Sequence, residues 1–497
     1  MKYFLYFVMF LTLNEVLLAK VIEVCPSCQH TRLLSAVQEV QPGDTILIRS
    51  GVYTTSEFIN NLQGTSDKWI TITASPGEEV ILRGQSEAIH LTDPAYLEIS
   101  NLIFEEQTAN GVNIDDGGSY DTPARHIKIL NCQWRNMNAT GNNDMLKLSG
   151  VDNFYISNCT FINGSAGGSG IDMVGCHNGI IEKCKFENQG SNSIQTKGGS
   201  QNIVIQKNTF INGGLRTLNI GGSTGLQYFR PIDAIFEASQ IYVYSNIFIG
   251  SQASIAFVGA VDCEVVNNTI YLPTKWAIRI LQENTLDRFQ KCGRNKFVNN
   301  IVYVNNNASN PTINIGPNTE PETFFFSNNL WYNKDNSNWN GPNLPVSESN
   351  GLVNIDPMIS QENEKMLLID KNSPAKRRGL NVEEPKEDFF GNMFNNPRSV
   401  GAVEVDPPTS EVYNENISCK MMIYPNPAKN YILVSIPNEY FKFNPISLEV
   451  YNSFGECIWK SSIENLSSNF LIDVSEFPTG IYLLKTFNEA IKFLILR

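Results

Sequence analysis

The sequence predicts an all-β protein, in which a parallel β-helix is followed by a small C-terminal β-sandwich. In the first part, a short apolar strand recurs, followed by Asn or Lys, then Cys or Asn, one further residue and a large apolar residue. These repeats read ILNCQW, YISNCTF, IEKCKF, IQKNTF, VYSNIF and VVNNTI. Repeats of strands, 22 to 38 residues apart, are typical of a solenoid. In the last part, YILVSI and SLEVY alternate apolar and polar residues, as half-buried strands do.

Aligning the repeats produces two columns that should stack from one coil to the next. The first column is aromatic or aliphatic and comprises Phe104, Trp134, Phe161, Phe186, Phe210, Phe248, Ile270, Val302 and Trp331. The second lies two residues earlier and comprises Leu102, Cys132, Cys159, Cys184, Asn208, Asn246, Asn268, Asn300 and Asn329. Stacked Asn side chains can hydrogen-bond along a ladder, and Cys packs as a small apolar residue. We therefore expect these cysteines to be packing residues rather than metal ligands.

Length and charge narrow the class of protein. A chain of 497 residues is too long for one compact core, whereas a solenoid can add coils without that limit. The net charge of -13 argues against a nucleic-acid partner, because phosphate binding calls for a basic surface. An acidic polysaccharide is compatible with this charge, since a local basic groove can exist on an acidic protein. We also expect no transmembrane segment in the mature chain.

The N-terminal region predicts export and a cap. Residues 1–19 have a basic start, a largely apolar stretch and a final Ala, which predicts a signal peptide. Cys25 and Cys28 follow, and in an exported chain we expect either a local disulfide or two free thiols. Residues 31–40 have apolar residues at helical spacing, which predicts a short helix that covers the first coil. Residues 45–49 are predicted to be the first strand.

The predicted β-helix domain spans residues 20–405. Residues 406–418 are polar and contain two prolines, which predicts a linker. Residues 419–497 form the last domain, where YPNPAKN (424–430) and DVSEFPTGIYLL (473–484) resemble type IX secretion C-terminal sorting domains. The resemblance implies recognition by the type IX secretion machinery and export across the outer membrane. It also implies removal of the domain, so that the protein is either secreted or attached to the cell surface.

Candidate functional residues lie on an outward face, because the interior of a β-helix is filled with apolar side chains. Adjacent coils are ~4.8 Å apart, so outward residues of successive coils nearly touch. One outward column and its neighbours bring together Lys147, Asp172, Gln195, Lys197, Arg216, Asn219 and Arg279. The alternative is a solvated face with ordinary salt bridges.

The one long gap between repeats predicts an inserted loop at residues 223–239, beside the same coils. It carries Tyr228 and Arg230, which could form one wall of a sugar-binding groove, although a purely structural insertion is equally compatible. The glycine pairs at 198–199 and 221–222 are predicted to let a bound chain approach the backbone.

Two stretches carry a second resemblance. TILIRSGVY (45–53) and SIQTKGGSQNIVIQKNTF (193–210) resemble right-handed β-helix polysaccharide lyases of the chondroitinase B and alginate lyase group. The resemblance implies Lys197 as the catalytic base. The family's arginine falls near Ile220, so that Arg216 would have to act on the leaving group. The family's acidic calcium ligands fall on Gly190 and Asn192, so no metal ligand is assigned and a role for Ca²⁺ stays open.

The first functional hypothesis is therefore an exported, monomeric polysaccharide lyase that cleaves a uronate-containing glycan by β-elimination. Lys197 would remove the carbon-bound proton, while Arg216, Arg279 or Asn219 would hold the carboxylate. Neighbouring cations would favour the neutral amine of Lys197. A glycoside hydrolase, with Asp172 and a second carboxylate from Asp115, Asp144, Asp233 or Glu237, is one alternative. A non-catalytic, glycan-binding surface protein is another.

Overall fold

The computed structural model describes residues 19–119, 122–363, 366–407, 422–424, 426, 428–435, 446–453, 455–463, 469–486 and 490–495. The predicted signal peptide, apart from Ala19, and residues 408–418 of the predicted linker lie outside these ranges. The β-helix and the C-terminal sheets are described separately below. In the described part of the chain, no helix is long and apolar enough to cross a membrane.

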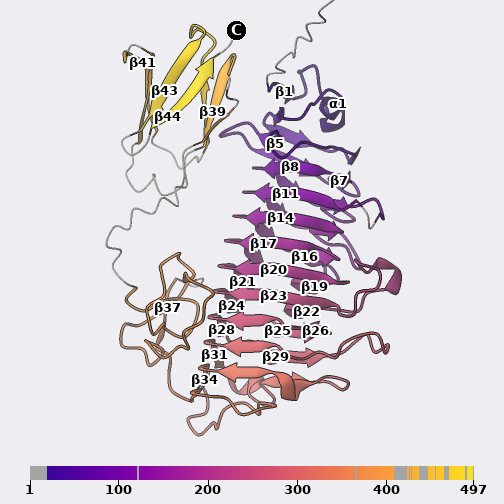
Figure 1. The fold of residues 1–497 in the computed structure, drawn as a ribbon, viewed down its shortest axis with the longest axis vertical. Coiled ribbons are helices and arrows are strands. Elements are labelled where there is room, and N and C mark those ends of the chain that lie inside the picture. The colour runs from indigo at the N-terminus through magenta and orange to yellow at the C-terminus, as the bar shows by residue number, and fades with distance from the viewer. Residues whose placement is uncertain are drawn as a thin grey trace, which may run out of the picture. The chain divides into compact units, whose positions relative to one another are not determined.

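Three parallel sheets form the β-helix, and each full coil contributes a strand to each sheet (Figure 1). Sheet A contains β1 (Val21–Val24), β2 (Thr45–Ile48), β5 (Ile70–Ala74), β8 (Ala95–Ser100), β11 (Ala124–Leu130), β14 (Val151–Ser157), β17 (His177–Glu182), β20 (Ser200–Gln206), β23 (Ala238–Tyr244), β26 (Ala260–Val261), β27 (Glu264–Val266), β30 (Lys296–Val298) and β33 (Phe325–Ser327). Sheet B contains β3 (Gly51–Tyr53), β6 (Val80–Arg83), β9 (Ile103–Glu105), β12 (Gln133–Arg135), β15 (Thr160–Ile162), β18 (Lys185–Glu187), β21 (Thr209–Ile211), β24 (Ile247–Ile249), β28 (Thr269–Tyr271), β31 (Ile301–Val304), β34 (Leu330–Asn333) and β35 (Leu352–Val353).

Sheet C carries the candidate site. Its strands are β4 (Glu57–Asn60), β7 (Ile89–Thr92), β10 (Val112–Asp115), β13 (Leu146–Ser149), β16 (Ser169–Val174), β19 (Asn192–Lys197), β22 (Arg216–Gly221), β25 (Ala253–Val258), β29 (Trp276–Leu281) and β32 (Ile313–Ile315). The coils also contain three short 3-10 helices, η1 (Leu226–Tyr228), η2 (Asn306–Ala308) and η3 (Pro321–Thr323).

The turn from sheet A to sheet B explains the repeat motif. The Asn or Lys before the Cys or Asn column adopts positive φ, as at Asn131 (53°), Asn158 (55°) and Lys183 (53°). Asn tolerates this left-handed conformation better than most residues, because its short amide can hydrogen-bond locally. The turn directs the next residue inward.

Both predicted columns are confirmed. Along the first, rings stack at centroid distances of 4.7 to 5.0 Å from Phe104 through Trp134, Phe161, Phe186 and Phe210 to Phe248. Along the second, each Asn Nδ2 donates to the Oδ1 of the next coil, at 3.0 Å from Asn208 to Asn246 and from Asn246 to Asn268. The same Nδ2 atoms also donate to backbone carbonyls, so the buried amides are satisfied inside the core.

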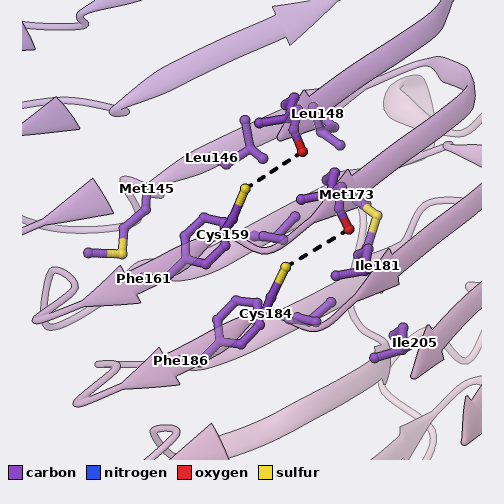
Figure 2. Close-up of a cluster of buried hydrophobic side chains, with 14 of the residues drawn as sticks. Met145, Leu146, Leu148, Cys159, Phe161, Met173, Ile181, Cys184, Phe186 and Ile205 are labelled. Carbon is purple, nitrogen blue, oxygen red and sulfur yellow. Dashed lines mark hydrogen bonds between the residues drawn. The ribbon is translucent and has the colours of Figure 1, made fainter. Parts of the chain in front are cut away.

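The cysteines of the second column are packing residues, as predicted. Cys159 and Cys184 lie one above the other, beside the stacked rings of Phe161 and Phe186 (Figure 2). Their Sγ atoms lie 3.6 and 3.9 Å from the carbonyl oxygens of Ile129 and Ile156, respectively. Burial raises the pKa of the Cys159 thiol well above its usual range, so this thiol stays protonated.

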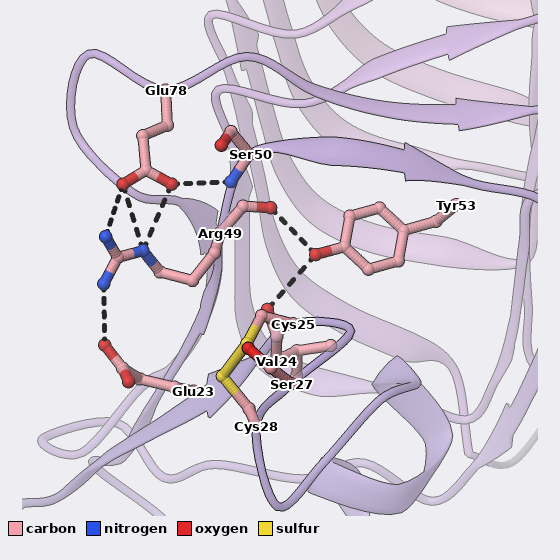
Figure 3. Close-up of a disulfide and its surroundings, with 9 residues drawn as sticks. All are labelled: Glu23, Val24, Cys25, Ser27, Cys28, Arg49, Ser50, Tyr53 and Glu78. Carbon is pink, nitrogen blue, oxygen red and sulfur yellow. Dashed lines mark hydrogen bonds and ion pairs between the residues drawn. A yellow bond between two sulfur atoms is a disulfide. The ribbon is translucent and has the colours of Figure 1, made fainter.

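The N-terminal cap differs in detail from the prediction. Residues 45–49 are not the first strand, because β1 precedes β2 and pairs with it. In β1, Ile22 and Val24 are buried, while Glu23 points outward to Arg49 at 3.2 Å (Figure 3). Cys25 and Cys28 form a disulfide directly after β1.

The predicted capping helix is shorter than residues 31–40. Helix α1 covers Leu33–Val37, with Leu33 and Ala36 buried. Glu57, the first residue of β4, accepts a hydrogen bond from the Leu34 amide at 3.0 Å. A carboxylate at a helix N-terminus satisfies one of the free N–H groups there.

After the last coil, the chain forms the hairpin β36 (Ile359–Asn363) and β37 (Met366–Ile369) and returns along sheet B. Val400 packs with Ile301 and Leu330, and Ala402 packs with Ile247, so this closing segment covers outward apolar residues of sheet B.

The C-terminal unit consists of two antiparallel sheets, as the alternating pattern predicted. One contains β38 (Met422–Tyr424), β39 (Tyr431–Ser435) and β42 (Asn469–Asp473). The other contains β40 (Ile446–Tyr451), β41 (Cys457–Ile463), β43 (Gly480–Lys485) and β44 (Ala490–Ile495). Ile432, Val450, Leu484 and Phe493 belong to their common core.

Candidate functional site

The outward column of sheet C has the predicted register. Parallel pairing aligns Asn113, Lys147, Asp172, Gln195, Asn219, Ala256 and Arg279 in successive coils. In the next outward column, Val174 is aligned with Lys197. The inward residues between them, such as Ile171 and Ile194, are buried in the core. The strand alternation therefore separates a packed interior from a polar outer face.

A groove lies along this face and consists of two adjoining hollows. The larger, of about 890 Å³, is lined by residues from β7 to β19 and by the inserted loop. The smaller, of about 350 Å³, is lined by residues around β19 and β22. Asn142, Lys197 and Ser223 line both hollows. The Lys197 side chain, 14% exposed, therefore lies where the two hollows meet.

Asp172 lies beneath two lysines. One carboxylate oxygen pairs with the Lys147 ammonium, and the other lies 3.1 Å from Lys197 Nζ. Lys197 Nζ also lies 3.3 Å from Gln195 Oε1, and Lys147 Nζ lies 3.6 Å from Asp144 Oδ2. Asp172 is 1% exposed and lines neither hollow, so its carboxylate contacts the two lysines and not the open groove.

The two buried carboxyl groups have opposite pKa shifts. Burial would raise the pKa of Asp172, but the charges of Lys147 and Lys197 outweigh it and hold this pKa below its usual range. Burial, together with the negative charge of Asp172, raises the pKa of Asp144 to about 7. The cluster therefore exchanges a proton near neutral pH.

One expectation about Lys197 is wrong. The charged group in contact with its amine is the Asp172 carboxylate and not a cation. The physical reason is the alternation along β16: Asp172 and Val174 point outward from the same strand, which brings the carboxylate beside the neighbouring Lys197.

The smaller hollow contains two of the three predicted carboxylate-binding groups, Arg216 and Asn219. Arg216 lies beside Asn219, with Nη1 3.4 Å from Asn219 Oδ1, and pairs with Glu283 at 2.7 Å. Gln195 and Asn219 also line this hollow. Arg279 lies further along the column, over the Trp276 ring and 3.0 Å from Asn314 Oδ1, and lines neither hollow.

The inserted loop forms one wall of the larger hollow, as predicted. Tyr228, which is 56% exposed, and Arg230 line it. Arg230 Nε and Nη2 donate to the two Asp116 oxygens at 2.5 and 2.6 Å, so this arginine ties the loop to the helix body. Glu237 is buried and accepts hydrogen bonds from Gly198 N and Thr224 N at the base of the loop.

The predicted glycine floor for a bound chain is wrong at Gly199 and Gly221. A Cβ atom on Gly199 would lie 2.5 Å from the carbonyl oxygen of Arg230, and one on Gly221 would lie 1.8 Å from that of Val258. The space beside these glycines is therefore occupied by the protein's own backbone. Gly199 allows the loop to pack closely on the coils, and Gly221 allows the end of β25 to approach closely.

Sequence reasoning missed the far end of the larger hollow. His90 lies there between Glu87, 2.9 Å from Nδ1, and Asp115, 2.7 Å from Nε2. His90 is aligned with Asn113, so extending the outward column by one coil would have found it. Glu283 lies after β29 and carries no such signal.

The structure does not bring together an open pair of the carboxylates suggested for a hydrolase. Asp144 and Asp172 are buried, Glu237 supports the loop, and of the five candidates only Asp115 lines the groove. Among the residues that the structure describes, no group of three His, Cys, Asp or Glu side chains could hold a metal ion.

Fold and groove together define a β-helix protein with one polar, cation-containing groove along a parallel sheet. Residues 87–270 match the family model described as a right-handed beta helix region, and residues 422–495 match that of a secretion system C-terminal sorting domain. The sorting domain indicates export, to the cell surface or the medium. A sequence comparison with curated proteins finds no match.

The fold is similar to that of a solved pectate lyase structure. The pectate lyase Pel9A has a TM-score of 0.51 at 11% identity, over 78% of this chain and 96% of that chain. An alginate lyase from Paenibacillus sp. str. FPU-7 has a TM-score of 0.39 at 17% identity, over 67% of this chain and 99% of that chain. At these identities the likeness concerns the fold.

Proposed function

We propose that the protein is an exported polysaccharide lyase that cleaves a uronate-containing glycan by β-elimination in the sheet C groove. The observation that carries this proposal is the place of Lys197, whose amine lies at the junction of two hollows and is held by Asp172 and Gln195. An elongated groove suits a polymer, and its cations suit carboxylates.

In this mechanism, Lys197 takes the proton on the carbon next to the uronate carboxylate. The electron pair left behind forms the carbon–carbon double bond as the bond to the glycosidic oxygen breaks. The departing oxygen takes the bonding electron pair and accepts a proton from water in the open groove. Arg216, beside Asn219, would stabilise the negative charge that develops on the carboxylate. Asp172 and Lys147 hold the base in place.

The Lys197 amine must be neutral before it can accept a proton. The cluster beneath it contains Asp144, whose pKa is raised to about 7 by burial and by the charge of Asp172, and whose Oδ2 lies 3.6 Å from Lys147 Nζ. The pectate and alginate lyases of similar fold support this reaction class by analogy of fold only.

The test uses the full chain with pectate, alginate, chondroitin sulfate and dermatan sulfate, and follows the ultraviolet absorbance of unsaturated uronate. We expect a signal on at least one polymer, and a loss of about 10²–10⁴-fold in Lys197→Ala. Lys296→Ala, which removes an exposed lysine of sheet A that pairs with Glu264, is the matched control and should retain activity.

Each outcome decides a separate point. A signal that survives Lys197→Ala would keep the lyase reaction and reject this base. New reducing ends without absorbance would select hydrolysis. Binding without turnover would select a non-catalytic glycan-binding protein.

A further inference from the structure

His177, the first residue of β17, lies behind the groove wall and has acceptors at both ring nitrogens. Nδ1 lies 2.8 Å from Asp152 Oδ1. Nε2 lies 3.2 Å from the carbonyl oxygen of Gly199 and 3.2 Å from that of Arg230. His177 therefore connects the helix body, through Asp152, to the inserted loop, through Arg230.

These contacts require the charged form of the ring. A neutral imidazole carries one N–H, so one of its nitrogens would turn a lone pair toward an oxygen acceptor. The imidazolium donates at both nitrogens and satisfies both sides. When the ring is neutral, we expect its single N–H to go to the Asp152 carboxylate, which is a stronger acceptor than a carbonyl. The carbonyl oxygens of Gly199 and Arg230 then lose their donor, so the link from Asp152 to the loop is complete only while His177 carries two ring protons.

The charged group in direct contact with His177 favours this form. Asp152 contacts the ring directly, and Arg125 and His126 lie on the strand beyond it, with Arg125 aligned to Asp152. The Arg230 guanidinium lies against Asp116. Burial lowers the pKa of His177, but the hydrogen bond and charge of Asp152 and the two carbonyls outweigh it and raise this pKa above 6.5.

The contribution of His177 to stability depends on pH. Because the folded protein binds this proton more tightly than the unfolded chain, the contribution of His177 is complete below about pH 6.5. It is lost as the pH rises through the raised pKa of the folded state.

The loop held by His177 supplies the groove wall. Ser223, Thr224, Gly225, Gln227, Tyr228 and Arg230 all line the larger hollow. The Arg230 side chain extends past Gly175 and Gly150 toward Asp116; a Cβ on Gly175 would lie 2.4 Å from Arg230 Cβ, and one on Gly150 would lie 2.5 Å from Arg230 Nε. The wall thus has one anchor at Asp116 and another at His177.

We propose that His177 is a positioning residue that holds the groove wall in place as an imidazolium and loosens it when the ring becomes neutral. The loop contacts carry this proposal without reference to the reaction. Only the effect on glycan binding rests on the proposed function.

The test is amide hydrogen exchange, followed by mass spectrometry on the full chain from pH 5.5 to 8.5, for peptides that cover residues 223–239. After correction for intrinsic exchange, we expect opening of the wild-type loop to rise about tenfold across one transition. His177→Gln should remove the transition, because an amide does not titrate. Asp152→Asn should move it to lower pH, because the ring loses its favourable charge.

His126→Gln is the matched control and should keep the wild-type transition, because the His126 ring stacks on the Tyr96 ring of β8. Position 126 has a φ of 55°, which Gln240 also adopts at 52°. A wild-type loop with no transition, or a transition lost equally in His126→Gln, would overturn the proposal.

Once a glycan that the protein cleaves is identified, its KM should rise several-fold across the same pH transition in the wild type. In His177→Gln, the KM should not change across this pH range. The ratio of kcat in the wild type to kcat in His177→Gln should change little with pH. If the exchange transition appears but no glycan is bound or cleaved, the proposed role of His177 stands and the proposed function fails. If a glycan is cleaved but the loop shows no transition, the proposed function stands and the proposed role of His177 fails.

Discussion

Two columns of the same β-helix have the same spacing between coils but differ in the residues that they stack. The interior column repeats one residue type, with Asn208, Asn246, Asn268 and Asn300 each bonded to the next. The outward column of sheet C changes at every step from Lys147 through Asp172 and Gln195 to Asn219. Repetition makes a continuous ladder, whereas variation brings unlike groups into contact. The first pattern stabilises the fold, and the second can build a site.

Burial sharpens this contrast. Asn246 is buried inside the helix, and Asp172 is equally buried although it lies on the outer face. The Asn246 amide is satisfied by neutral partners of its own kind. The Asp172 carboxylate depends on two cations, Lys147 and Lys197. The outer column should therefore be the more sensitive to the loss of a single charge.

The largest expected effect is that of Asp172→Asn. It leaves the two lysines without their shared carboxylate, and breaking a buried ion pair costs about 3–5 kcal/mol. Chemical denaturation should show this loss in the free energy of unfolding, and turnover should fall as well because Lys197 loses its support. Asp262→Asn, in the exposed pair with Arg294, is the control and should cost less than about 1 kcal/mol. Equal losses in the two variants would remove the contrast.

A smaller loss of stability is expected from Asn246→Ala. The variant removes a donor to Ile205 O and breaks the ladder on both sides, and unsatisfied buried groups cost roughly 1–3 kcal/mol each. We expect a loss of about 2–4 kcal/mol by denaturation, with activity retained in the folded fraction.

Asn212→Gly provides the comparison for that variant. Asn212 is an exposed amide, 3.3 Å from Asn188 Oδ1, and has a φ of 49° that Gly tolerates. It should change the free energy of unfolding by less than about 1 kcal/mol. A ladder that tolerates Asn246→Ala as well as this variant would not be a stabilising element.

The smallest expected effect is a change in pH dependence in Asp144→Asn. The raised pKa of Asp144 means that the folded state holds this proton up to about pH 7, while the unfolded chain releases it near pH 4. Stability from this group therefore falls as the pH rises through that window. The variant should flatten the slope and gain about 2–3 kcal/mol at pH 8 relative to its difference at pH 5. If the free energies of unfolding of the wild type and the variant change in parallel with pH, Asp144 does not carry this proton.

Much of this contrast could be predicted from the sequence. The motif spacing aligned Lys147, Asp172 and Gln195 correctly, because strand alternation and coil stacking are periodic. The same periodicity would have reached His90 with one more coil. The N-terminal β1 was missed because its four residues lie outside the repeat motif.

Several features of the site depend on contacts that the sequence repeat does not predict. Arg230 meets Asp116 across 114 positions in the chain, and Arg216 meets Glu283 across 67. The glycines at 198–199 and 221–222 were interpreted as open space, although backbone carbonyls fill it at Gly199 and Gly221, and side chains approach closely at Gly198 and Gly222. The path of the loop decides these contacts, and local spacing does not encode that path.

The sequence alone was enough to establish the β-helix, its two interior columns, the alternating C-terminal sheets and the face that carries Lys197. Each of these follows from short-range rules, namely alternation along a strand and stacking between coils. Only the tertiary structure shows that Asp172 lies beneath two lysines, that Arg230 is bound to Asp116 and that His177 reaches the loop. Those properties arise from burial and from long-range packing, which place charges next to partners that are remote in the chain.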